Sequence, residues 1–268
     1  MRWPRIALGL ALSAVLASNS SRGAAAEPDA DTIVRKSLQA LYYGGSDMVA
    51  QVTMSLIDSA GKSRVRSLSM LRKNVGAAGE QRYFIYFHSP PDVMDMTFLV
   101  HKFPDKDDDR WMFIPAVRMV KRVAASDKRS SFVGSDFTYD DVSGRDALDE
   151  KSTLVRSEVL NGRPCYVLES VPRERSSFAK RISWVDKERF LPLKEQFISD
   201  KGETIRTFSA DEVKESGGVW TISKRTMSDT RSGRRTEVLF RDVRYSVGLS
   251  DEVFTEGSLR SPPRQWLK

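Results

Sequence analysis

The sequence contains few of the residues from which many catalytic and metal-binding sites are built. Among 268 residues there is one cysteine, Cys165, and there are two histidines, His88 and His101. A single cysteine cannot form a disulfide within the chain, and three such residues cannot complete a four-ligand zinc site of Cys and His. We therefore expect a packed core, rather than cross-links or a structural metal, to stabilise the fold.

Several motifs that would indicate an enzyme or a cofactor are also absent. There is no G-x-S-x-G motif of a serine hydrolase and neither of the glycine-rich patterns that bind nucleotide phosphates. Asp105, Asp107 and Asp109 match positions 1, 3 and 5 of a calcium loop, but Arg110 replaces the glycine at position 6 and Ala116 the glutamate at position 12. We expect a solvated hairpin turn there, with no metal and no cofactor.

Long apolar runs are missing, apart from a short one at the N-terminus. Ile6 to Ala17 follows two arginines and precedes the small residues Ala24 to Ala26, a pattern typical of a secretory signal peptide. The run is too short for a membrane-spanning helix. We expect residues 1–26 to be a signal peptide cleaved after Ala26, and residues 27–268 to form a single exported domain.

The charge balance argues against a nucleic-acid-binding protein. Of the 43 Lys and Arg residues, Arg2, Arg5 and Arg22 fall in the expected signal peptide, while all 36 Asp and Glu residues follow it, so the formal charge falls from +7 to +4. Charges of both signs alternate along the rest of the chain, with no basic tail. We expect no nucleic-acid partner.

One helix is predicted, close after the expected cleavage site. Asp29 or Asp31 can cap it, apolar residues recur at helical spacing from Ile33 to Tyr42, and Gly44 with Gly45 ends it. The apolar stripe predicts that this short helix lies on another element.

A succession of strands follows. In residues 47–58 Met48, Ala50, Val52, Met54 and Leu56 alternate with polar residues, the pattern of a strand with one buried face. The next strand, 62–73, is rich in arginine and serine, which predicts a face that is solvated or only partly covered. Further β-rich segments are 81–89, 95–103 and 110–123.

The second half of the chain repeats this pattern with clearer turns. Asn161-Gly162 is the strongest hairpin signal, because both central residues of a type I′ turn require positive φ. Turns are also expected at 186–189, 200–202, 216–218 and 232–233. The fold class predicted is mainly β, an antiparallel meander closed or half closed into a barrel.

Residues 130–142, SSFVGSDFTYDDV, combine a serine and carboxylates with aromatic side chains. Ser135, Asp136, Asp140 and Asp141 could form a catalytic cluster, but Asp140 and Asp141 point to different sides if the segment is extended. A structured loop is the alternative, in which Gly134 permits a bend and the aromatic residues fold inward.

A curved sheet lined by Met, Phe, Tyr and Trp, with a helix across it, could enclose a cavity for an acyl chain. The alternative is that these residues only pack a core beneath the helix. Alternation predicts burial without specifying the partner, so it leaves both interpretations open.

Four segments resemble one known family. They are 110–123 (RWMFIPAVRMVKRV), 130–142, 184–197 (WVDKERFLPLKEQF) and 239–259 (LFRDVRYSVGLSDEVFTEGSL). Together they are similar to the outer membrane lipoprotein-sorting protein-like family, relatives of the periplasmic lipoprotein carrier LolA. The resemblance implies an incomplete antiparallel β-barrel with a helical lid, a hydrophobic cavity, and a non-enzymatic carrier that moves lipid or lipoprotein cargo through the periplasm toward an outer-membrane acceptor. It also implies an inner-membrane transporter of the resistance-nodulation-division type as the donor.

On this hypothesis two sets of residues form the site. Acyl chains would contact apolar and aromatic side chains, and cations would contact head groups or a partner, although a solvated strand face is the alternative for the cations. The lipid-binding set is Met48, Val52, Met54, Leu56, Trp111, Phe113, Phe132, Phe137 and Tyr139, and the cationic set is Arg118, Lys121 and Arg122.

Two other functions stay open at this stage. A sensor or adaptor could share the fold and bind a membrane protein without carrying lipid; it predicts a filled cavity. An envelope hydrolase would require Asp136, Asp140 and His88 or His101 to converge.

Overall fold

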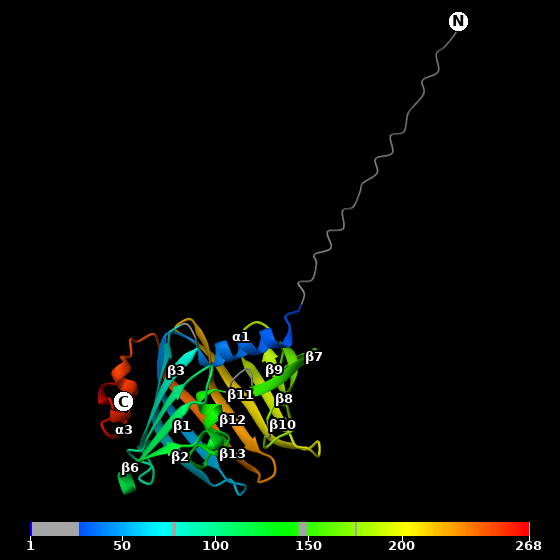
Figure 1. Ribbon diagram of the computed structural model, residues 1–268. Helices are drawn as coiled ribbons and strands as arrows, with labels where there is room; N and C mark the ends of the chain where they lie inside the picture. The colour runs from blue at the N-terminus through cyan, green and yellow to red at the C-terminus, as the bar shows by residue number, and fades with distance from the viewer. Residues whose placement is uncertain (2–26, 77–78, 145–148, 175, 268) are drawn as a thin grey trace.

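The computed structural model describes Met1 and residues 27–76, 79–144, 149–174 and 176–267 (Figure 1). The expected signal peptide and its cleavage site therefore lie almost entirely outside the described residues. Within the described residues, no helix combines the length and hydropathy needed to cross a bilayer.

The predicted N-terminal helix is confirmed as α1, Ala30–Tyr42. Asp29 caps it, since its carboxylate accepts a hydrogen bond of 2.7 Å from the backbone N–H of Thr32. Ile33 is fully buried against Tyr166, Leu168 and Val185 of the sheet. The helix thus crosses one open end of the curved sheet, at the top of Figure 1.

Thirteen antiparallel strands form one curved, open sheet, which confirms the mainly β fold and the incomplete barrel. The first six follow the chain from one side of the sheet: β1 Asp47–Ile57, β2 Ser63–Val75, β3 Glu80–Ser89, β4 Thr97–Lys102, β5 Asp109–Ile114 and β6 Met119–Val123. The other seven are β7 Glu150–Leu160, β8 Arg163–Pro172, β9 Lys180–Asp186, β10 Pro192–Ile198, β11 Thr204–Ser216, β12 Val219–Asp229 and β13 Arg234–Tyr245.

Neighbours along the chain are neighbours in the sheet, with one long-range exception. The strand order is β6-β5-β4-β3-β2-β1-β13-β12-β11-β10-β9-β8-β7, so the first and last strands pair at the centre of the sheet. Met54 lies opposite Val238 in that pair, and Val52 lies opposite Phe240. The two halves of the chain are therefore joined edge to edge, while β6 and β7 end the sheet.

Local turn signals placed most hairpins correctly. Asn161 and Gly162 both have positive φ, 50° and 79°, in the tight turn between β7 and β8. The segment 110–123 is a hairpin of β5 and β6, joined by the 3-10 turn η1, Pro115–Val117, with Arg118 in the left-handed region at φ 49°.

The inner face of the sheet holds the main core. Alternate residues of β1 to β4, among them Met54, Met70, Ile85 and Phe98, turn toward a buried cluster that extends to Phe208 and Met227 on β11 and β12. The chain between β6 and β7 enters this space with two short helices, η3 Phe132–Gly134 and α2 Tyr139–Ser143 (green in Figure 1). We call residues 130–144 the plug.

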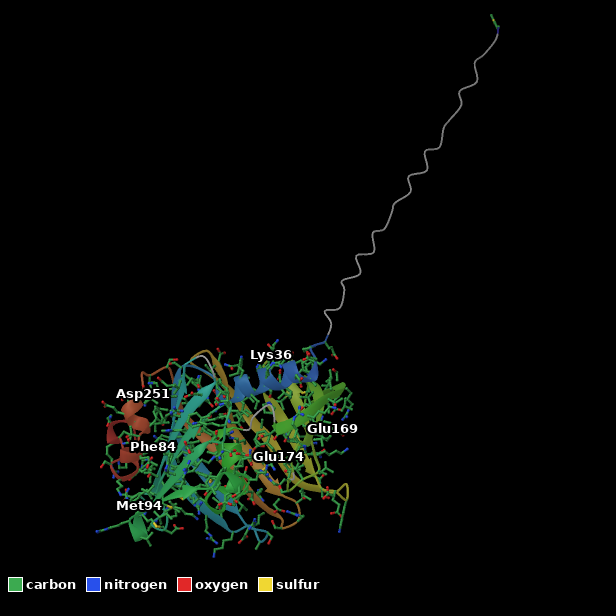
Figure 2. All side chains as sticks on the ribbon, viewed as in Figure 1. Lys36, Phe84, Met94, Glu169, Glu174 and Asp251 are labelled. Carbon is green, nitrogen blue, oxygen red and sulfur yellow. The ribbon has the colours of Figure 1, made fainter. Side chains whose placement is uncertain are left out.

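The outer face of β1 to β5 is covered by the C-terminal segment, residues 247–267, which contains η5 Asp251–Phe254, α3 Glu256–Arg260 and η6 Arg264–Trp266. Its Leu249, Val253, Phe254 and Leu259 are buried against residues such as Phe84, which Figure 2 shows on that side of the molecule. The prediction of a solvated face on the second strand is therefore wrong from Leu68 to Arg72, where every residue is buried.

Asp47 anchors this segment to the sheet. Its buried carboxylate accepts backbone hydrogen bonds from Val247, Gly248 and Leu249, at 2.7, 2.9 and 3.0 Å. A carboxylate that receives several N–H donors is well compensated for its burial. The C-terminal segment is consequently part of the folded domain rather than a tail.

Candidate functional site

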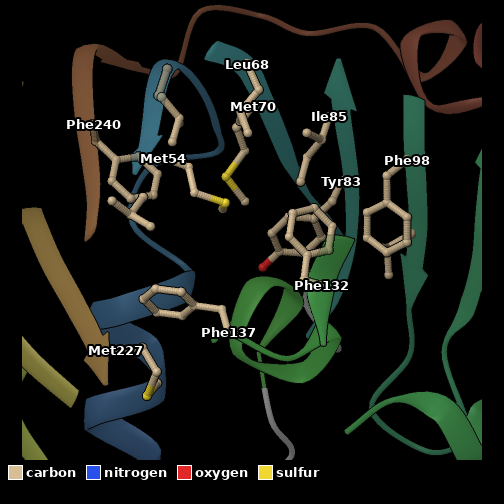
Figure 3. Close-up of a cluster of buried hydrophobic side chains, with 14 of the residues drawn as sticks. Met54, Leu68, Met70, Tyr83, Ile85, Phe98, Phe132, Phe137, Met227 and Phe240 are labelled. Carbon is tan, nitrogen blue, oxygen red and sulfur yellow. The ribbon is translucent and has the colours of Figure 1, made fainter. Parts of the chain in front are cut away.

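The plug fills the inner face of β1 to β4 with aromatic side chains. Phe132 is 1% exposed, and its ring centroid lies 5.4 Å from that of Phe98 and 5.6 Å from that of Tyr139. Figure 3 shows Phe132 among Tyr83, Ile85 and Phe98, whereas Phe137 extends toward Met227 on the other side. The plug thus occupies one half of the interior and borders the other.

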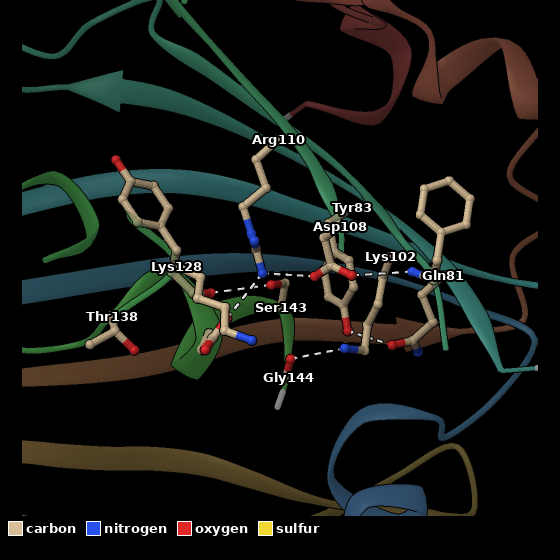
Figure 4. A network of polar contacts seen from close by, with 12 residues as sticks. Gln81, Tyr83, Lys102, Asp108, Arg110, Lys128, Thr138, Ser143 and Gly144 are labelled. Atoms are coloured by element: carbon tan, nitrogen blue, oxygen red, sulfur yellow. Dashed lines mark hydrogen bonds and ion pairs between the residues drawn. The ribbon is translucent and has the colours of Figure 1, made fainter. Parts of the chain in front are cut away.

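Buried ion pairs fix the plug to the sheet. The guanidinium of Arg110 on β5 lies 2.7 Å from the carboxylate of Asp108 and 3.0 Å from that of Asp140 in the plug, and Lys102 donates to the carbonyl of Gly144 at 3.0 Å (Figure 4). The side chains of Arg110, Asp108 and Asp140 are 2%, 4% and 9% exposed. A buried ion pair is costly to leave incomplete, so these contacts determine where the plug sits.

The other plug carboxylates also have structural roles. Asp141 forms a capping box with Thr138 at the start of α2 and pairs with Arg206 on β11. Asp136 accepts a hydrogen bond of 2.7 Å from the hydroxyl of Thr236 and lies 3.5 Å from Arg234. The structured-loop interpretation of residues 130–142 is therefore confirmed, and the carboxylates are explained without catalysis.

The two histidines do not meet these carboxylates. His88 Nε2 lies 2.7 Å from the hydroxyl of Ser69, and His101 Nε2 lies 2.8 Å from the carbonyl of Phe254 in the C-terminal segment. Burial lowers the pKa of both imidazoles. They lie on the outer face, and Asp136 and Asp140 lie inside, so the convergence that a hydrolase would require is not found.

The described residues also contain no group of three or more His, Cys, Asp or Glu side chains arranged to hold a metal ion. Asp105 to Asp108 lie in the turn between β4 and β5, and Asp109 begins β5. Asp108 pairs with Arg110, and Asp109 pairs with Arg122.

A cavity lies between α1 and the second half of the sheet. This roof cavity measures ≈ 830 Å³ including the solvent at its mouth. Its roof is the apolar face of α1, with Val34, Leu38 and Leu41, and Phe137 of the plug and Met227 contribute to its walls. An apolar lining with a few polar side chains is typical of a small-molecule site.

The floor of the roof cavity is polar. It carries the hydroxyls of Ser152, Ser170 and Ser183 and an ionic cluster on β7, β9 and β10. In that cluster Arg181 lies 2.5 Å from Glu150, pairs with Glu195, and donates to Ser183 at 2.8 Å. The charged groups are thus paired with one another beneath an apolar roof.

Two further cavities adjoin the roof cavity. The arginine cavity lies beneath the end of α1, and the core cavity lies between the plug and the central strands. They measure ≈ 510 Å³ and ≈ 380 Å³, each including the solvent at its mouth. Arg225 on β12 lines all three. The arginine cavity is lined by Ala40, Leu41, Tyr42, Met48, Met70, Arg72, Tyr83, Val142, Leu191, Trp220, Thr221, Ile222, Arg225, Phe240 and Tyr245. The core cavity is lined by Val52, Met54, Leu68, Met70, Ile85, Phe132, Phe137, Asp141, Val142, Arg225, Val238 and Phe240.

Most of the residues predicted to bind lipid lie around these cavities. Met48 lines the arginine cavity, Val52, Met54, Phe132 and Phe137 line the core cavity, and Tyr139 and Leu56 pack on the same buried cluster. Seven of the nine predicted residues thus share the inner face.

The other two do not join them. Trp111 and Phe113 alternate with Met112 on β5 and turn to the outer face, where they pack on the C-terminal segment. Arg118, Lys121 and Arg122 are exposed on or beside the edge strand β6, and Arg122 pairs with Asp109. The structure therefore separates the predicted cations from the cavities.

Sequence reasoning missed the inner-face arginines Arg72, Arg181 and Arg225. The available signal was alternation: Arg225 stands two residues before the buried Met227, and Arg72 two residues after the buried Met70. An arginine in phase with buried residues on a strand must face the interior.

Comparisons with known proteins agree with this architecture. A family model described as that of an uncharacterized protein matches residues 79–261. No curated protein matches the chain. A solved DUF1329 family protein from Desulfovibrio piger is 27% identical with a TM-score of 0.79, and the match covers 85% of this chain and 97% of that one.

Two other solved structures are similar. A protein described as an outer membrane lipoprotein-sorting protein domain, from Vibrio parahaemolyticus, is 27% identical with a TM-score of 0.79, over 86% of this chain and 98% of that one. A LolA superfamily protein from Nitrosomonas europaea is 20% identical with a TM-score of 0.67, over 86% and 99% of the two chains. The chain belongs to the outer membrane lipoprotein-sorting protein-like family, as its own sequence segments predict.

Proposed function

We propose that the protein is a non-enzymatic periplasmic carrier that binds lipid, or the acyl chains of a lipoprotein, and moves them toward the outer membrane. The observation that carries the proposal is the roof cavity, whose apolar roof is a single helix. Family membership and the neighbour described as a lipoprotein-sorting domain support it.

The helix α1 has the attributes of a lid. It is amphipathic, it contacts the sheet mainly through the apolar face that roofs the cavity, and Gly44 and Gly45 join it to β1. Gly45 has φ +65°, a conformation that glycine adopts readily. Movement of this helix would open the cavity, and it would require release of Ile33 from the sheet and of the hydrogen bonds that Arg72 and Gln81 donate to the end of the helix.

Transfer requires a donor and an acceptor, and we propose that an inner-membrane transporter of the resistance-nodulation-division type is the donor. This part of the proposal is supported by the family resemblance and by one surface feature. Val117 and Met119, 61% and 48% exposed, stand beside Arg118, Lys121 and Arg122 at the β6 edge of the sheet. An exposed edge with apolar and cationic side chains suits contact with a membrane protein or anionic head groups.

Bound lipid is the decisive test. The protein would be purified from the periplasm without detergent, extracted with organic solvent, and the extract examined by mass spectrometry, with fluorescent fatty acids titrated into the delipidated protein. We expect co-purifying lipid and saturable binding. Absence of both would refute the carrier function.

A matched pair of variants on α1 links the result to the roof cavity. Leu38→Asn places an amide in the roof, whereas Gln39→Asn alters the neighbouring exposed position. We expect the first to lower lipid retention several-fold and the second to leave it unchanged, since an unpaired amide in an apolar wall is unfavourable. Equal retention by both variants would show that lipid does not lie beneath α1.

A further inference from the structure

The arginine cavity has an unusual charge composition. Among the described residues that line it, the ionisable ones are Arg72, Arg225 and three tyrosines, Tyr42, Tyr83 and Tyr245, and none is a carboxylate. The other lining residues are apolar, apart from Thr221. Two cations therefore share an apolar-walled space with no anion among the described lining residues.

Arg225 has no ion-pair partner among the described residues. Its guanidinium lies 4.4 Å from the ring centroid of Phe240, the ring of a neighbouring strand, and it faces all three cavities. The nearest plug carboxylate, that of Asp141, is already held by Arg206 and by the capping box of α2. A guanidinium carries five N–H donors, so Arg225 has unused capacity for an acceptor.

Arg72 is in a similar position. It is 4% exposed; one terminal nitrogen donates to the carbonyl of Gly44, and its Nε is buried without a hydrogen-bond partner. Burial lowers the pKa of both guanidiniums, and Tyr83 and Tyr245 act electrostatically on both. The two arginines thus belong to one electrostatic environment. Arg72 is buried and Arg225 half-buried, and the rings of Tyr245 and Phe240 compensate them only in part, since neither guanidinium has an ion-pair partner among the described residues.

We propose that the arginine cavity binds the anionic head, carboxylate or phosphate, of an acyl lipid, with the head between Arg72 and Arg225 and the chain in the adjoining core cavity. Charge-assisted hydrogen bonds to such an oxyanion would satisfy the unused donors. The two cavities share Met70, Val142 and Phe240, and the core cavity continues with Val52, Met54 and Leu68, which suit a hydrocarbon chain. This inference rests on the proposed carrier function and specifies the class of its ligand.

The test compares ligands that differ only at the head. Octadecenoic acid, octadecenol and a one-chain glycerol phosphate lipid would be titrated separately into the delipidated protein by displacement of a fluorescent fatty acid, together with inorganic phosphate. We expect the wild type to bind the acid or the phosphate lipid about 10-fold or more tightly than the alcohol, because hydrogen bonds to charged groups contribute this much. The acid and the phosphate lipid distinguish the two sources of the anion.

Variants assign the preference to the arginine. Arg225→Gln should reduce the preference for the charged head to less than about 3-fold, whereas Arg241→Gln, at an exposed position of the neighbouring strand, should keep it. Arg225→Lys should give an intermediate ratio, since it keeps the charge with fewer donors. The melting temperature of Arg225→Met should equal or exceed that of the wild type, because a half-buried cation without an ion-pair partner among the described residues is removed.

The outcomes separate this inference from the proposed function. If acid and alcohol bind equally, or if Arg225→Gln leaves their ratio unchanged, the carrier function stands and the anion site is refuted. If inorganic phosphate binds through Arg225 but no amphiphile does, the site takes a free anion and the lipid assignment is wrong. If no ligand binds and no lipid co-purifies, the carrier function fails and the inference fails with it.

Discussion

The inner face of β1 to β4 carries mainly methionine and aromatic side chains, whereas the inner face of β7 to β10 also carries the serine, glutamate and arginine side chains that line the roof cavity. The first half is occupied by the plug, with Phe132 fully buried among aromatic rings. The second half is roofed by α1 and keeps the roof cavity. Because both halves use the same antiparallel meander, curvature of the sheet does not decide which half is hollow. The side chains on the strands, and the segment that covers them, decide it.

The roof cavity and the core cavity meet at the border of the two halves. Arg225 and Phe137 lie there, and both line the roof cavity and the core cavity. The core cavity continues from this border between the plug and the central strands, so a ligand that extends into the first half would lie against the plug. Experiments should therefore first change the contacts that attach the plug to the sheet.

The largest effect is expected from Arg110→Ala. This change leaves Asp108 and Asp140 buried without their shared cation, which costs about 3 to 5 kcal/mol in the free energy of unfolding. Urea denaturation followed by circular dichroism would measure it. Arg118→Ala, an exposed position near the same strand, should shift the free energy by less than about 0.5 kcal/mol. A small effect of Arg110→Ala would mean that the plug is held by packing alone.

A second pair of substitutions tests the filled half against the hollow half. Phe132→Ala removes a fully buried ring that packs on Phe98 and Tyr139 and should cost about 3 to 4 kcal/mol. Leu38→Ala removes part of a half-buried side chain that already borders a cavity, so a cost of about 1 kcal/mol or less is expected. Both free energies come from the same denaturation experiment. Equal costs would show that the two halves are packed alike.

Features of the fold that neighbouring residues determine could be predicted from the sequence, whereas features that depend on residues far apart in the chain could not. The limits of α1 and the Asn161-Gly162 hairpin were predicted because caps and turns are determined by neighbouring residues. The prediction placed Trp111 and Phe113 on the inner face, together with the other lipid-binding residues. Because successive residues of a strand point to opposite faces, they lie on the face opposite Met112. The alternation within β5 does not show which of its two faces is the inner one. The outer face is covered by the C-terminal segment, which lies more than 130 residues further along the chain.

The cavities could not be predicted from the sequence, because residues far apart in the chain form their walls. Alternation indicated that Met48, Val52 and Met54 are buried, and it could not show whether side chains from elsewhere fill the space before them. The pairing of β1 with β13, which brings Phe240 and Val238 opposite this set, joins residues almost 200 positions apart. Arg225 was overlooked because an arginine on a strand is ordinarily exposed.

The smallest expected effect is that of pH on hydrogen exchange, which should differ between the two halves of the sheet. Both histidines, His88 and His101, lie on the outer face of the filled half, and burial lowers the pKa of each below the ordinary value of 6.5. The folded state thus favours neutral imidazoles, so their contribution to stability is present above about pH 6.5 and is lost as the pH falls through the lowered folded values. We expect hydrogen exchange, corrected for its intrinsic pH dependence, to accelerate modestly between pH 7.5 and 5.5 in β3, β4 and the C-terminal segment, and not in β8 and β9. The double variant His88→Gln, His101→Gln should abolish this difference. An equal acceleration in both halves, or one that persists in the double variant, would show that other groups titrate and that the two halves respond to acid as one unit.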